Sequence, residues 1–372
     1  MIRNQVLKLA QHCVRMLGAE QAHDLSISAL CAGLHPIAKE PDDPRLAVRL
    51  LGQKFPNPIG IAAGFDKNAQ VYNAMHQMGF GFAEAGTVTP LAQIGNAKPR
   101  AFRLPKHRAI INRYGFNNEG MDAFQQCLKD APAQGILGIN VGANKLTKDK
   151  AADYAACIEK LAQYAAYITI NISSPNTPGL RGLQVGAALD DLLARVVEAR
   201  DKAARIRVEG NEMPKPLLLK IAPDVSEDHL DAIVKSVLDH RIEGMIVSNT
   251  TFDRQSVVGS SNAKQAGGLS GAPLFDRSTI ILAKTRERAG RAFPLIGVGG
   301  ISSGEQAVQK LEAGANLIQL YTGFVYNGFE LLADVKKELI AAMDKEGFSR
   351  VSVLTSSNVQ EWASKPFPTL PV

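Results

Sequence analysis

Residues 167–181 read Y-I-T-I-N-I-S-S-P-N-T-P-G-L-R, and they show the pattern on which the fold of this chain depends. Residues 167–170 form a short apolar run that is typical of a buried strand. Asn171, Ser174 and Asn176 follow, so the predicted strand ends in side chains rich in hydrogen-bonding groups. Such a strand end can bind a small polar ligand, and it can equally be an ordinary Asn/Ser/Pro turn.

The same pattern occurs eight times after residue 55. Each apolar run ends in Gly, Asn, Ser or Thr, and most runs are followed by a helical pattern. Continuous apolar runs without alternation are typical of parallel strands that are buried on both faces. We expect strands at residues 58–65, 82–88, 136–142, 167–173, 216–223, 244–251, 294–301 and 317–323. We expect helices at residues 68–78, 118–129, 150–165, 187–204, 227–240, 274–289, 304–313 and 328–345.

Eight strand–helix units predict an α/β protein that folds as a (β/α)8 TIM barrel. A doubly wound parallel sheet is the main alternative. It is disfavoured by the count of eight and by the absence of G-x-G-x-x-G in the first turn. In a barrel of this kind the active site lies at the carboxyl ends of the strands, so the polar strand ends should face one another.

Three regions are expected along the 372 residues. Residues 44–349 form the barrel, and residues 350–372 form an irregular tail. Residues 1–43 form an amphipathic helical hairpin, which either packs on the barrel as structure or lies in a membrane surface and shields an apolar ligand. The apolar stripes of the hairpin are Val6, Leu7, Leu9, Ala10, Val14 and Leu17, and then Ala22, Leu25, Ile27, Ala29 and Leu30.

The composition excludes several classes of protein. Hydrophobic and charged contents of 45% and 21% are typical of a globular chain, and the net charge of +6 suits anionic ligands or an anionic membrane surface. No basic run with interleaved aromatic residues is present, so nucleic-acid binding is not expected. The N-terminus lacks the apolar core of a signal peptide, and no apolar run is long enough for a membrane span.

No motif for metal binding is present. The four cysteines show no C-x-x-C spacing, the histidines form no cluster, and H-E-x-x-H does not occur. We therefore expect reduced thiols and no catalytic metal.

Two glycine-bearing segments predict a phosphate site. G-V-G-G-I-S-S at 297–303 and Y-T-G-F at 321–324 end the seventh and eighth predicted strands, where barrels hold phosphate with backbone N–H groups. Glycine permits close approach of the backbone to the ligand. A third segment, G-G-L-S-G at 267–271, is interpreted as a flexible loop that closes over a ligand or as a plain glycine turn.

Lys67 and Lys220 lie at the ends of the first and fifth predicted strands. Such a lysine can be a Schiff-base nucleophile, as in a barrel lyase or aldolase. It can instead be a fixed charge that stabilises an anion, which we favour with a phosphate-bearing cofactor, or it can pair with Asp66 or Asp224.

Four amides are expected at one mouth of the barrel: Asn112, Asn171, Asn176 and Asn249. Amides suit a ligand with alternating C=O and N–H groups, such as a pyrimidine. Asn112 opens N-R-Y-G-F (112–116), which follows no barrel strand and is expected to be a loop over the mouth.

These segments together resemble the dihydroorotate dehydrogenase family. The resemblance rests on A-A-G-F-D-K (62–67), N-R-Y-G-F (112–116), N-I-S-S-P-N-T-P-G-L-R (171–181), K-I-A-P-D (220–224), S-N-T-T (248–251), G-G-L-S-G (267–271), G-V-G-G-I (297–301) and Y-T-G-F (321–324). The match covers about residues 45 to 345 in order. It implies FMN as cofactor and the oxidation of dihydroorotate to orotate in pyrimidine biosynthesis.

Site residues follow from the resemblance position by position. Ser174 is implied as the base that takes the C5 proton while hydride leaves C6 for the flavin, with Thr177 as proton relay and Phe116 excluding water. The implied substrate-binding residues are Lys67, Asn112, Arg113, Tyr114, Gly115, Phe116, Asn171, Asn176, Asn249 and Thr250. The implied FMN-binding residues are Ala63, Gly64, Thr87, Asn140, Asn171, Lys220, Ser248, Gly271, Gly300, Tyr321 and Thr322.

The resemblance also implies a branch of the family. Serine at position 174, where soluble members have cysteine, and the N-terminal helices are features of the quinone-dependent, membrane-associated branch. His23, Arg103 and Tyr321 match positions that meet the quinone head. The expected protein is a monomer held peripherally at the cytoplasmic side of a membrane through residues 1–40, with a membrane quinone as final electron acceptor.

Overall fold

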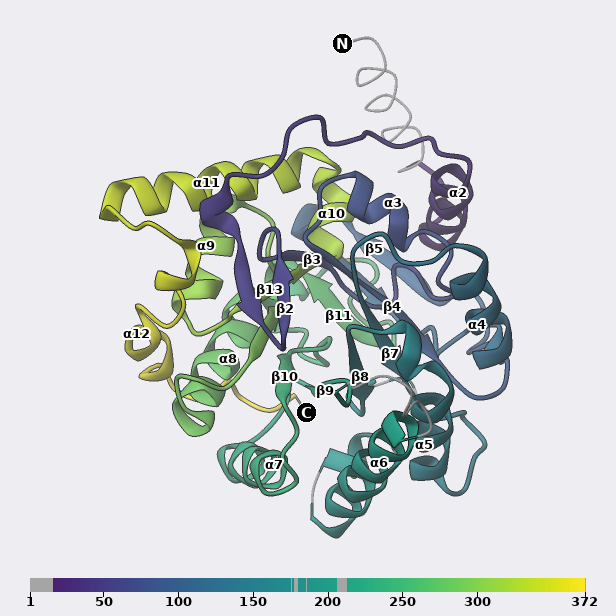
Figure 1. The fold of residues 1–372 in the computed structure, drawn as a ribbon. Helices are drawn as coiled ribbons and strands as arrows, with labels where there is room; N and C mark the ends of the chain where they lie inside the picture. Colours follow the sequence, from purple (N-terminus) through teal and green to yellow (C-terminus); the bar gives the residue numbers. More distant parts are fainter. Residues whose placement is uncertain (1–15, 175, 177–179, 185, 206–212, 372) are drawn as a thin grey trace.

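Eight parallel strands form a closed barrel in the computed structural model, which describes residues 16–174, 176, 180–184, 186–205 and 213–371, with only the backbone of Arg181 (Figure 1). The ring closes where β13 pairs with β3. The predicted TIM barrel is confirmed, and every predicted strand overlaps an observed one. The barrel strands are β3 (Ile59–Ile61), β4 (Phe82–Val88), β7 (Ile136–Val141), β8 (Tyr167–Asn171), β9 (Leu217–Ile221), β10 (Gly244–Val247), β12 (Leu295–Val298) and β13 (Leu317–Leu320).

Helices surround this barrel, and their starts follow from the sequence. The side chains of Asp149, Ser226 and Ser303 accept hydrogen bonds from backbone N–H groups of the first turns of α5, α7 and α9. The eight predicted helices correspond to α3 (Tyr72–Gln77), α4 (Gly120–Asp130), α5 (Lys150–Leu161), α6 (Ala187–Arg205), α7 (Glu227–Asp239), α8 (Phe275–Ala289), α9 (Gly304–Glu312) and α11 (Glu330–Glu346). An unpredicted helix, α10 (Thr322–Asn327), begins where the eighth strand was expected to end.

Large aromatic side chains fill the amino-terminal end of the barrel. Phe82 packs edge-to-face against Phe55, with ring centroids 5.4 Å apart, and its ring lies 6.4 Å from that of Tyr167. Two strand glycines make room for these rings. A Cβ at Gly60 would lie 2.4 Å from the Phe82 ring, and one at Gly138 would lie 2.2 Å from that of Tyr167. This end is therefore filled by side chains, and a cavity lies toward the opposite end.

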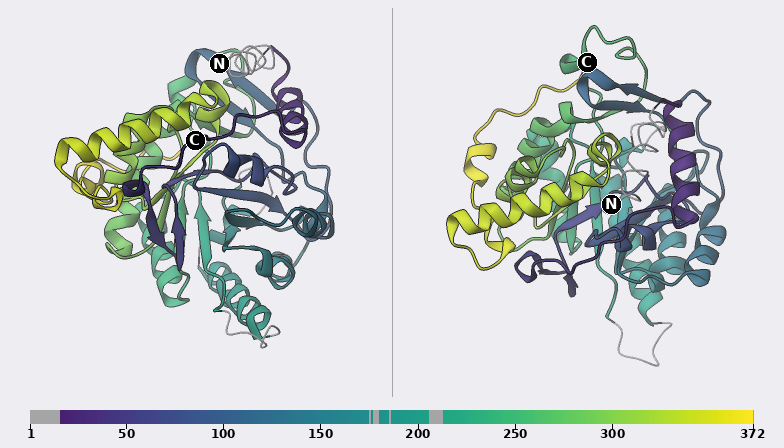
Figure 2. Two further views of the ribbon diagram at one scale, coloured as in Figure 1. Left: turned by 45° about the horizontal axis from the view of Figure 1, so that its top comes forward. Right: turned by 90° about the horizontal axis from the view of Figure 1, so that it is seen from above.

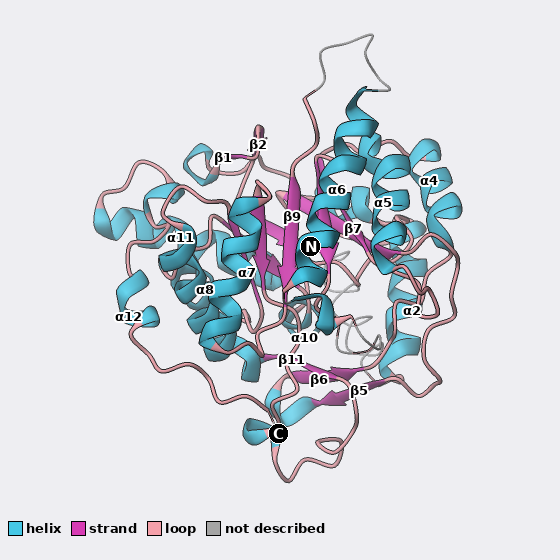
Figure 3. Cartoon of the chain, turned by 90° about the horizontal axis from the view of Figure 1, so that it is seen from below, coloured by secondary structure: helices cyan, strands magenta, loops and turns pink. Residues whose placement is uncertain are grey.

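Two small sheets lie at opposite ends of the barrel (Figure 3). A hairpin of β1 (Val48–Leu50) and β2 (Gln53–Phe55) lies at the packed end. An antiparallel sheet of β5 (Ala101–Leu104), β6 (Ala109–Asn112) and β11 (Gly268–Gly271) lies across the other end.

The three-stranded sheet corrects one prediction and refines another. Asn112 is the last residue of β6, which is not a barrel strand, and the predicted loop is made by residues 113–116. Residues 268–271 form β11, not a flexible loop, because their backbone pairs with that of residues 109–112.

The N-terminal region contributes α2 (Ala19–Cys31) beside β5. Ala22 and Leu30 of the second predicted stripe are buried, and Leu25 is 47% exposed. The first stripe, apart from Leu17, lies outside the described residues. Within the described residues, no helix combines the length and the apolar character needed to cross a membrane.

The C-terminal tail is more ordered than predicted. It contains α12 (Val359–Ala363), which packs on α8, and the side chain of Trp362 is only 6% exposed. After α12, the chain, yellow in Figure 2 and pink in Figure 3, runs along the outside of the barrel toward the three-stranded sheet. Short 3-10 turns complete the described elements at Pro44–Leu46, Pro105–His107, Ala162–Tyr164, Arg181–Gln184, Gln255–Val257, Ala272–Leu274 and Val351–Val353.

Candidate active site

A cavity of about 500 Å³ lies at the carboxyl ends of the barrel strands. One part of its wall is polar and is made by strand ends, such as Thr87, Lys220 and Ser248. Another part is apolar and is made by α2, including Leu25 and Leu30. The cavity therefore joins a polar centre to an apolar helix face.

Most of the predicted site residues line this one cavity. From the predicted cofactor set these are Ala63, Gly64, Thr87, Asn171, Lys220, Ser248, Gly271, Gly300, Tyr321 and Thr322. From the other sets they are Lys67, Asn112, Tyr114, Gly115, Phe116, Ser174, Asn249 and Thr250, together with His23 and Arg103. Thr177 lies outside the described residues.

Three predicted residues are placed elsewhere. Asn140 is fully buried beneath the cavity wall. The Arg113 guanidinium donates to Gln265 Oε1 and to backbone carbonyls of residues 99 and 266, and so is held away from the cavity. Asn176 is tied through its backbone: its N–H donates to Ser174 Oγ at 3.3 Å, and its carbonyl accepts from an amide of Asn96.

A hydrogen-bonded chain of side chains fixes the polar strand ends. Asn171 Nδ2 donates to Thr87 Oγ1 at 3.0 Å and to Asn140 Oδ1 at 3.1 Å. Asn171 Oδ1 accepts from Ser173 Oγ at 2.9 Å, and that oxygen in turn accepts from Asn249 Nδ2 at 2.9 Å. Residues from four strands are thereby held in one geometry, which a binding site for a small polar ligand requires.

Glu84 is a buried carboxylate below this chain, and no sequence motif pointed to it. Its Oε1 accepts from Asn140 Nδ2 at 2.8 Å, and its Oε2 accepts from Gln319 Nε2 at 2.8 Å and from Tyr167 OH at 3.0 Å. The only available signal was a charged residue inside the otherwise apolar run 82–88. Glu84 anchors the polar network to the barrel interior.

Lys220 is buried, and no described residue accepts a hydrogen bond from its ammonium group. Burial lowers the pKa of Lys220, and the charge of Glu84 opposes that shift. Asp224, one predicted partner, instead accepts from Thr251 Oγ1 and from Phe252 N. A buried cation with free donors at a cavity wall suits an anionic or electron-rich ligand edge.

Lys67 contacts two other cavity residues. Its Nζ lies 2.8 Å from His23 Nε2 and 4.7 Å from the centre of the Tyr114 ring. Burial lowers the pKa of Lys67 to about 8. Burial, together with the charge of the nearby Lys67, lowers the pKa of His23 well below 6.5. His23 is therefore neutral and accepts from the ammonium. Asp66 does not pair with Lys67, because its oxygens accept from backbone N–H groups of residues 70 and 71.

Ser174 is 4% exposed, and its hydroxyl lies in the cavity wall. The Phe116 ring packs beside Thr87, since a Cβ at Gly142 would meet both side chains within 3 Å. Hydrogen bonds from Gln93 and Asn118 to the Phe116 carbonyl fix this residue at φ 54°. An enclosed hydroxyl and a fixed aromatic ring in the wall of one cavity provide a dry place for proton transfer.

Two glycines shape another part of the wall. A Cβ at Gly300 would lie 2.3 Å from the Phe275 backbone, and one at Gly271 would lie 2.3 Å from the Arg108 carbonyl oxygen. Both have positive φ, 80° and 101°. Thr322, which opens α10, shares a 2.8 Å hydrogen bond with Ser270 Oγ. Close packing therefore requires glycine at both positions in the loops where a phosphate was predicted.

Aromatic side chains connect the polar centre to α2. Tyr321 OH donates to the Gly64 carbonyl at 3.1 Å, and its ring is 5.9 Å from that of Phe65. The Phe65 ring is in turn 5.7 Å from the His23 ring. Arg103 Nη1 donates to the Leu17 carbonyl at 2.6 Å at the same side of the cavity. The described residues contain no group of three or more His, Cys, Asp or Glu positioned to hold a metal ion.

The barrel and this cavity define an enzyme that acts on a small polar ligand, and comparison with known proteins gives its family. Residues 45–343 match the family model described as dihydroorotate dehydrogenase. The dihydroorotate dehydrogenase (quinone) of Brucella ovis is 49% identical over 360 residues, which cover 96% of this chain and 97% of that protein. That of Brucella anthropi is 48% identical over 358 residues, with the same coverage.

Solved structures agree with these sequence relationships. The crystal structure of an Eimeria tenella DHODH in complex with ferulenol superposes with a TM-score of 0.86 at 35% identity, covering 91% of this chain and 95% of that one. The ligand-free form gives 0.84, with 90% and 98% covered.

The chain belongs to the dihydroorotate dehydrogenase family, a family of FMN-dependent oxidoreductases, and its relatives are quinone-dependent enzymes. The predicted family and branch are confirmed. The chain therefore oxidises dihydroorotate in pyrimidine biosynthesis, and the Schiff-base lyase or aldolase alternative is not supported by these relatives.

Proposed function

We propose that this chain transfers hydride from dihydroorotate to bound FMN and passes the electrons to a membrane quinone. The observation that carries the proposal is the single cavity that joins Lys220 and Ser174 to the apolar face of α2. The two successive reactions use a polar acid and an apolar quinone. They therefore need a polar and an apolar environment, both within reach of one cofactor.

The residues present fit FMN. Gly300 and Gly271 line the cavity at the proposed phosphate position, and the buried Lys220 ammonium has free donors for the ring system. When bound, FMN accepts hydride from the substrate and is reoxidised by the quinone. Positive charge at Lys220 favours the negative charge that develops on the ring during reduction.

Ser174 is proposed to remove the proton from C5 of the substrate. A serine hydroxyl is a poor base in water, so it needs a dry, positioned site and an acceptor for its own proton. Phe116 closes the wall beside the polar centre, and the enclosure of Ser174 keeps bulk water away. Thr177 remains the proposed relay for the proton.

The substrate carboxylate and ring amides are proposed to bind among Lys67, Asn112, Asn171, Asn249 and Thr250. Lys67 supplies the only cation of this set, and the amides can both donate and accept. The amide of Asn249 is oriented by Ser173, and its Oδ1 accepts from Thr250 N at 2.8 Å. The side chain of Arg113 is engaged elsewhere, so we leave it out of this set.

The quinone is proposed to enter along α2 and to meet His23, Arg103 and Tyr321. These three residues line the cavity at its apolar side. The exposed apolar side chains of Leu25 on α2 and of Leu34 just after it suit contact with a membrane surface. A monomer attached peripherally at the cytoplasmic side of the membrane fits this arrangement.

The absorbance spectrum of the purified protein tests the proposal. We expect flavin bands that disappear when dihydroorotate is added without oxygen and return when a quinone is added. A colourless protein, or flavin that dihydroorotate does not reduce, would contradict it.

A further inference from the structure

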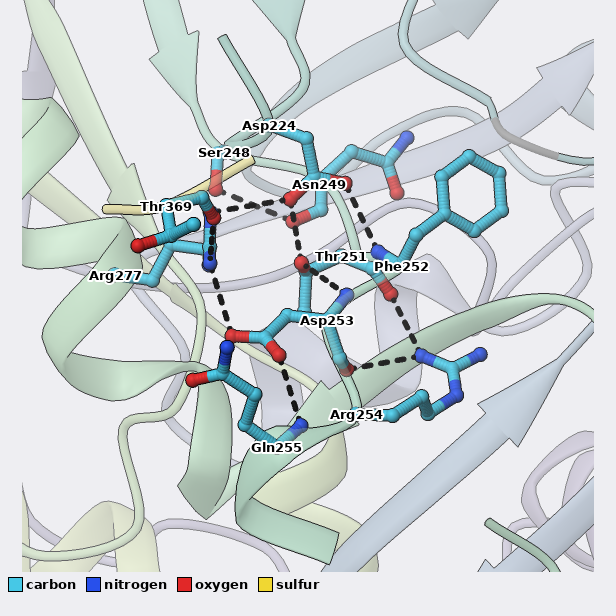
Figure 4. Close-up of polar contacts among 10 residues, drawn as sticks. All are labelled: Asp224, Ser248, Asn249, Thr251, Phe252, Asp253, Arg254, Gln255, Arg277 and Thr369. Carbon is cyan, nitrogen blue, oxygen red and sulfur yellow. Dashed lines mark hydrogen bonds and ion pairs between the residues drawn. The ribbon is translucent and has the colours of Figure 1, made fainter. Parts of the chain in front are cut away.

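The last described residues return to the mouth of the barrel. The Thr369 carbonyl accepts a hydrogen bond of 2.7 Å from Arg277 Nη2 (Figure 4). Arg277 lies in the first turn of α8, and it is only 8% exposed. The tail therefore supplies an acceptor to a buried cation at the start of α8.

Arg277 also faces two carboxylates. Its Nη2 donates to Asp253 Oδ2 at 2.9 Å, and its Nη1 lies 3.6 Å from Asp224 Oδ1. Burial raises the pKa of Asp253, but hydrogen bonds from Gln255 N and from Arg277 outweigh it and hold this pKa below 3.8. One guanidinium thus joins the tail to two acidic side chains.

The Asp224 carboxylate holds the segment that follows β10. Asp224 accepts from Thr251 Oγ1 and, at 2.9 Å, from Phe252 N (Figure 4). Asp253 N donates to Thr251 Oγ1 at 2.9 Å. Thr251 directly follows Asn249 and Thr250, which line the cavity. A shift of this segment would move both of them.

The tail is docked on α8 by other contacts as well. Lys284 Nζ donates to the Ala363 carbonyl at 2.7 Å and lies 4.6 Å from the centre of the Phe367 ring. Trp362 packs edge-to-face on Phe275 at 5.9 Å. These contacts already order the chain between α12 and Phe367. The Thr369 carbonyl can therefore bond to Arg277 with little additional loss of conformational entropy.

We propose that residues 364–371 act as a brace that positions Asn249 and Thr250 through Arg277. The inference rests on the proposed use of these two residues as substrate ligands. The Thr369 carbonyl and Asp253 Oδ2 both accept from Arg277 Nη2, and these two acceptors set the orientation of the guanidinium. In that orientation Nη1 faces Asp224, which holds the segment 249–252 through Thr251 and Phe252. Arg277 and the tail are positioning elements and do not touch the substrate.

Two shortened chains test the brace. A chain that ends after Lys365 keeps α12 but lacks the Thr369 carbonyl, whereas a matched control that ends after Thr369 keeps it. We expect the shorter chain to bind orotate roughly three- to tenfold more weakly in calorimetry and to show a similar rise in KM for dihydroorotate. The FMN content of the protein should stay unchanged, and the control should behave as the full chain does.

Arg277→Met in the full chain should weaken orotate binding at least as much. Combining it with the shorter chain should add nothing further, because both act through one interaction. Additive effects, or an unchanged Kd in the shorter chain, would overturn the proposal. If the shorter chain does not fold, Phe367→Ala, which loosens the docked tail, decides the question: an unchanged Kd overturns the brace.

Asn249→Ala in the full chain separates the brace from the function on which it rests. If that variant binds orotate normally, the proposed substrate ligand is wrong. If it binds orotate weakly while the tail variants bind normally, only the brace is wrong.

Discussion

The ammonium group of Lys67 lies 2.8 Å from Nε2 of His23, so a proposed substrate ligand on the barrel contacts a proposed quinone-side residue on α2. The contact encloses Lys67 and lowers its pKa to about 8 through loss of solvation. With this lowered pKa, the cation predominates below pH 8 and is lost as the pH rises through that value.

Orotate binding should follow this titration. We expect a nearly constant Kd from pH 6 to 7 and a rise of up to about tenfold per pH unit above pH 8, because a neutral Lys67 no longer attracts the carboxylate. Calorimetry across this range measures the effect. Lys67→Met should bind weakly and without this pH dependence, whereas a variant that retained it would assign the titration to another group.

Ser174→Ala should slow the reduction of flavin by dihydroorotate by roughly 10²–10⁴, or about 3–5 kcal/mol in barrier, with orotate affinity little changed. Anaerobic stopped-flow absorbance measures the reductive step alone. Ser173→Ala is the contrasting variant: it removes a hydroxyl bonded to Asn171 and Asn249, so it should raise KM more than it lowers the rate. Reduction at near wild-type rate in Ser174→Ala would show that another group is the base.

Gly300→Ala should give protein that is purified with little FMN. The added Cβ would lie 2.3 Å from the Phe275 backbone, so the loop must move from the position proposed to hold the phosphate. Gly347→Ala is the matched control, because Gly347 also has positive φ (68°) but open space around it. Gly347→Ala should lower the free energy of unfolding by about 1 kcal/mol, and the variant should keep its flavin. Equal flavin content in the two variants would argue against a phosphate at Gly300.

Glu84→Ala should destabilise the protein by about 3–5 kcal/mol in chemical denaturation. The substitution leaves Asn140, Gln319 and Tyr167 without their common acceptor, and it removes the negative charge that faces Lys220. Glu84→Gln retains an acceptor and similar volume, so its loss should be smaller. If both variants unfold at the wild-type denaturant concentration, the buried network does not stabilise the barrel.

Deleting residues 1–40 should leave flavin reduction by dihydroorotate largely intact and impair reoxidation by quinone. A milder pair of variants tests the same point on α2. Leu25→Asp places a charge in the apolar wall and should raise KM for a quinone, whereas Ser28→Asp, at an exposed position outside the cavity wall, should not. Equal loss of both half-reactions after deletion would mean that the N-terminal region is only structural.

Much of the fold could be predicted because its signals are local. The run at 82–88 coincides with β4, and Ser226 and Ser303 mark the starts of α7 and α9. The sheet of β5, β6 and β11 was missed because residues 268–271 pair with a strand more than 150 positions earlier, and four residues with two glycines carry no strand pattern. The ordered tail was missed for a similar reason: α12 is five residues long and depends on packing against α8.

By itself, the sequence determined the eight strand–helix units, the family and most of the residues that line the cavity, since periodicity and short motifs are properties of neighbouring positions. Only the tertiary structure decided how these residues act together. The placement of Glu84 under Asn140, the contact of Lys67 with His23 and the reach of Thr369 to Arg277 each join segments far apart in the chain. Such contacts form where closure of the barrel brings buried charges and unsatisfied donors together, and no local pattern encodes them.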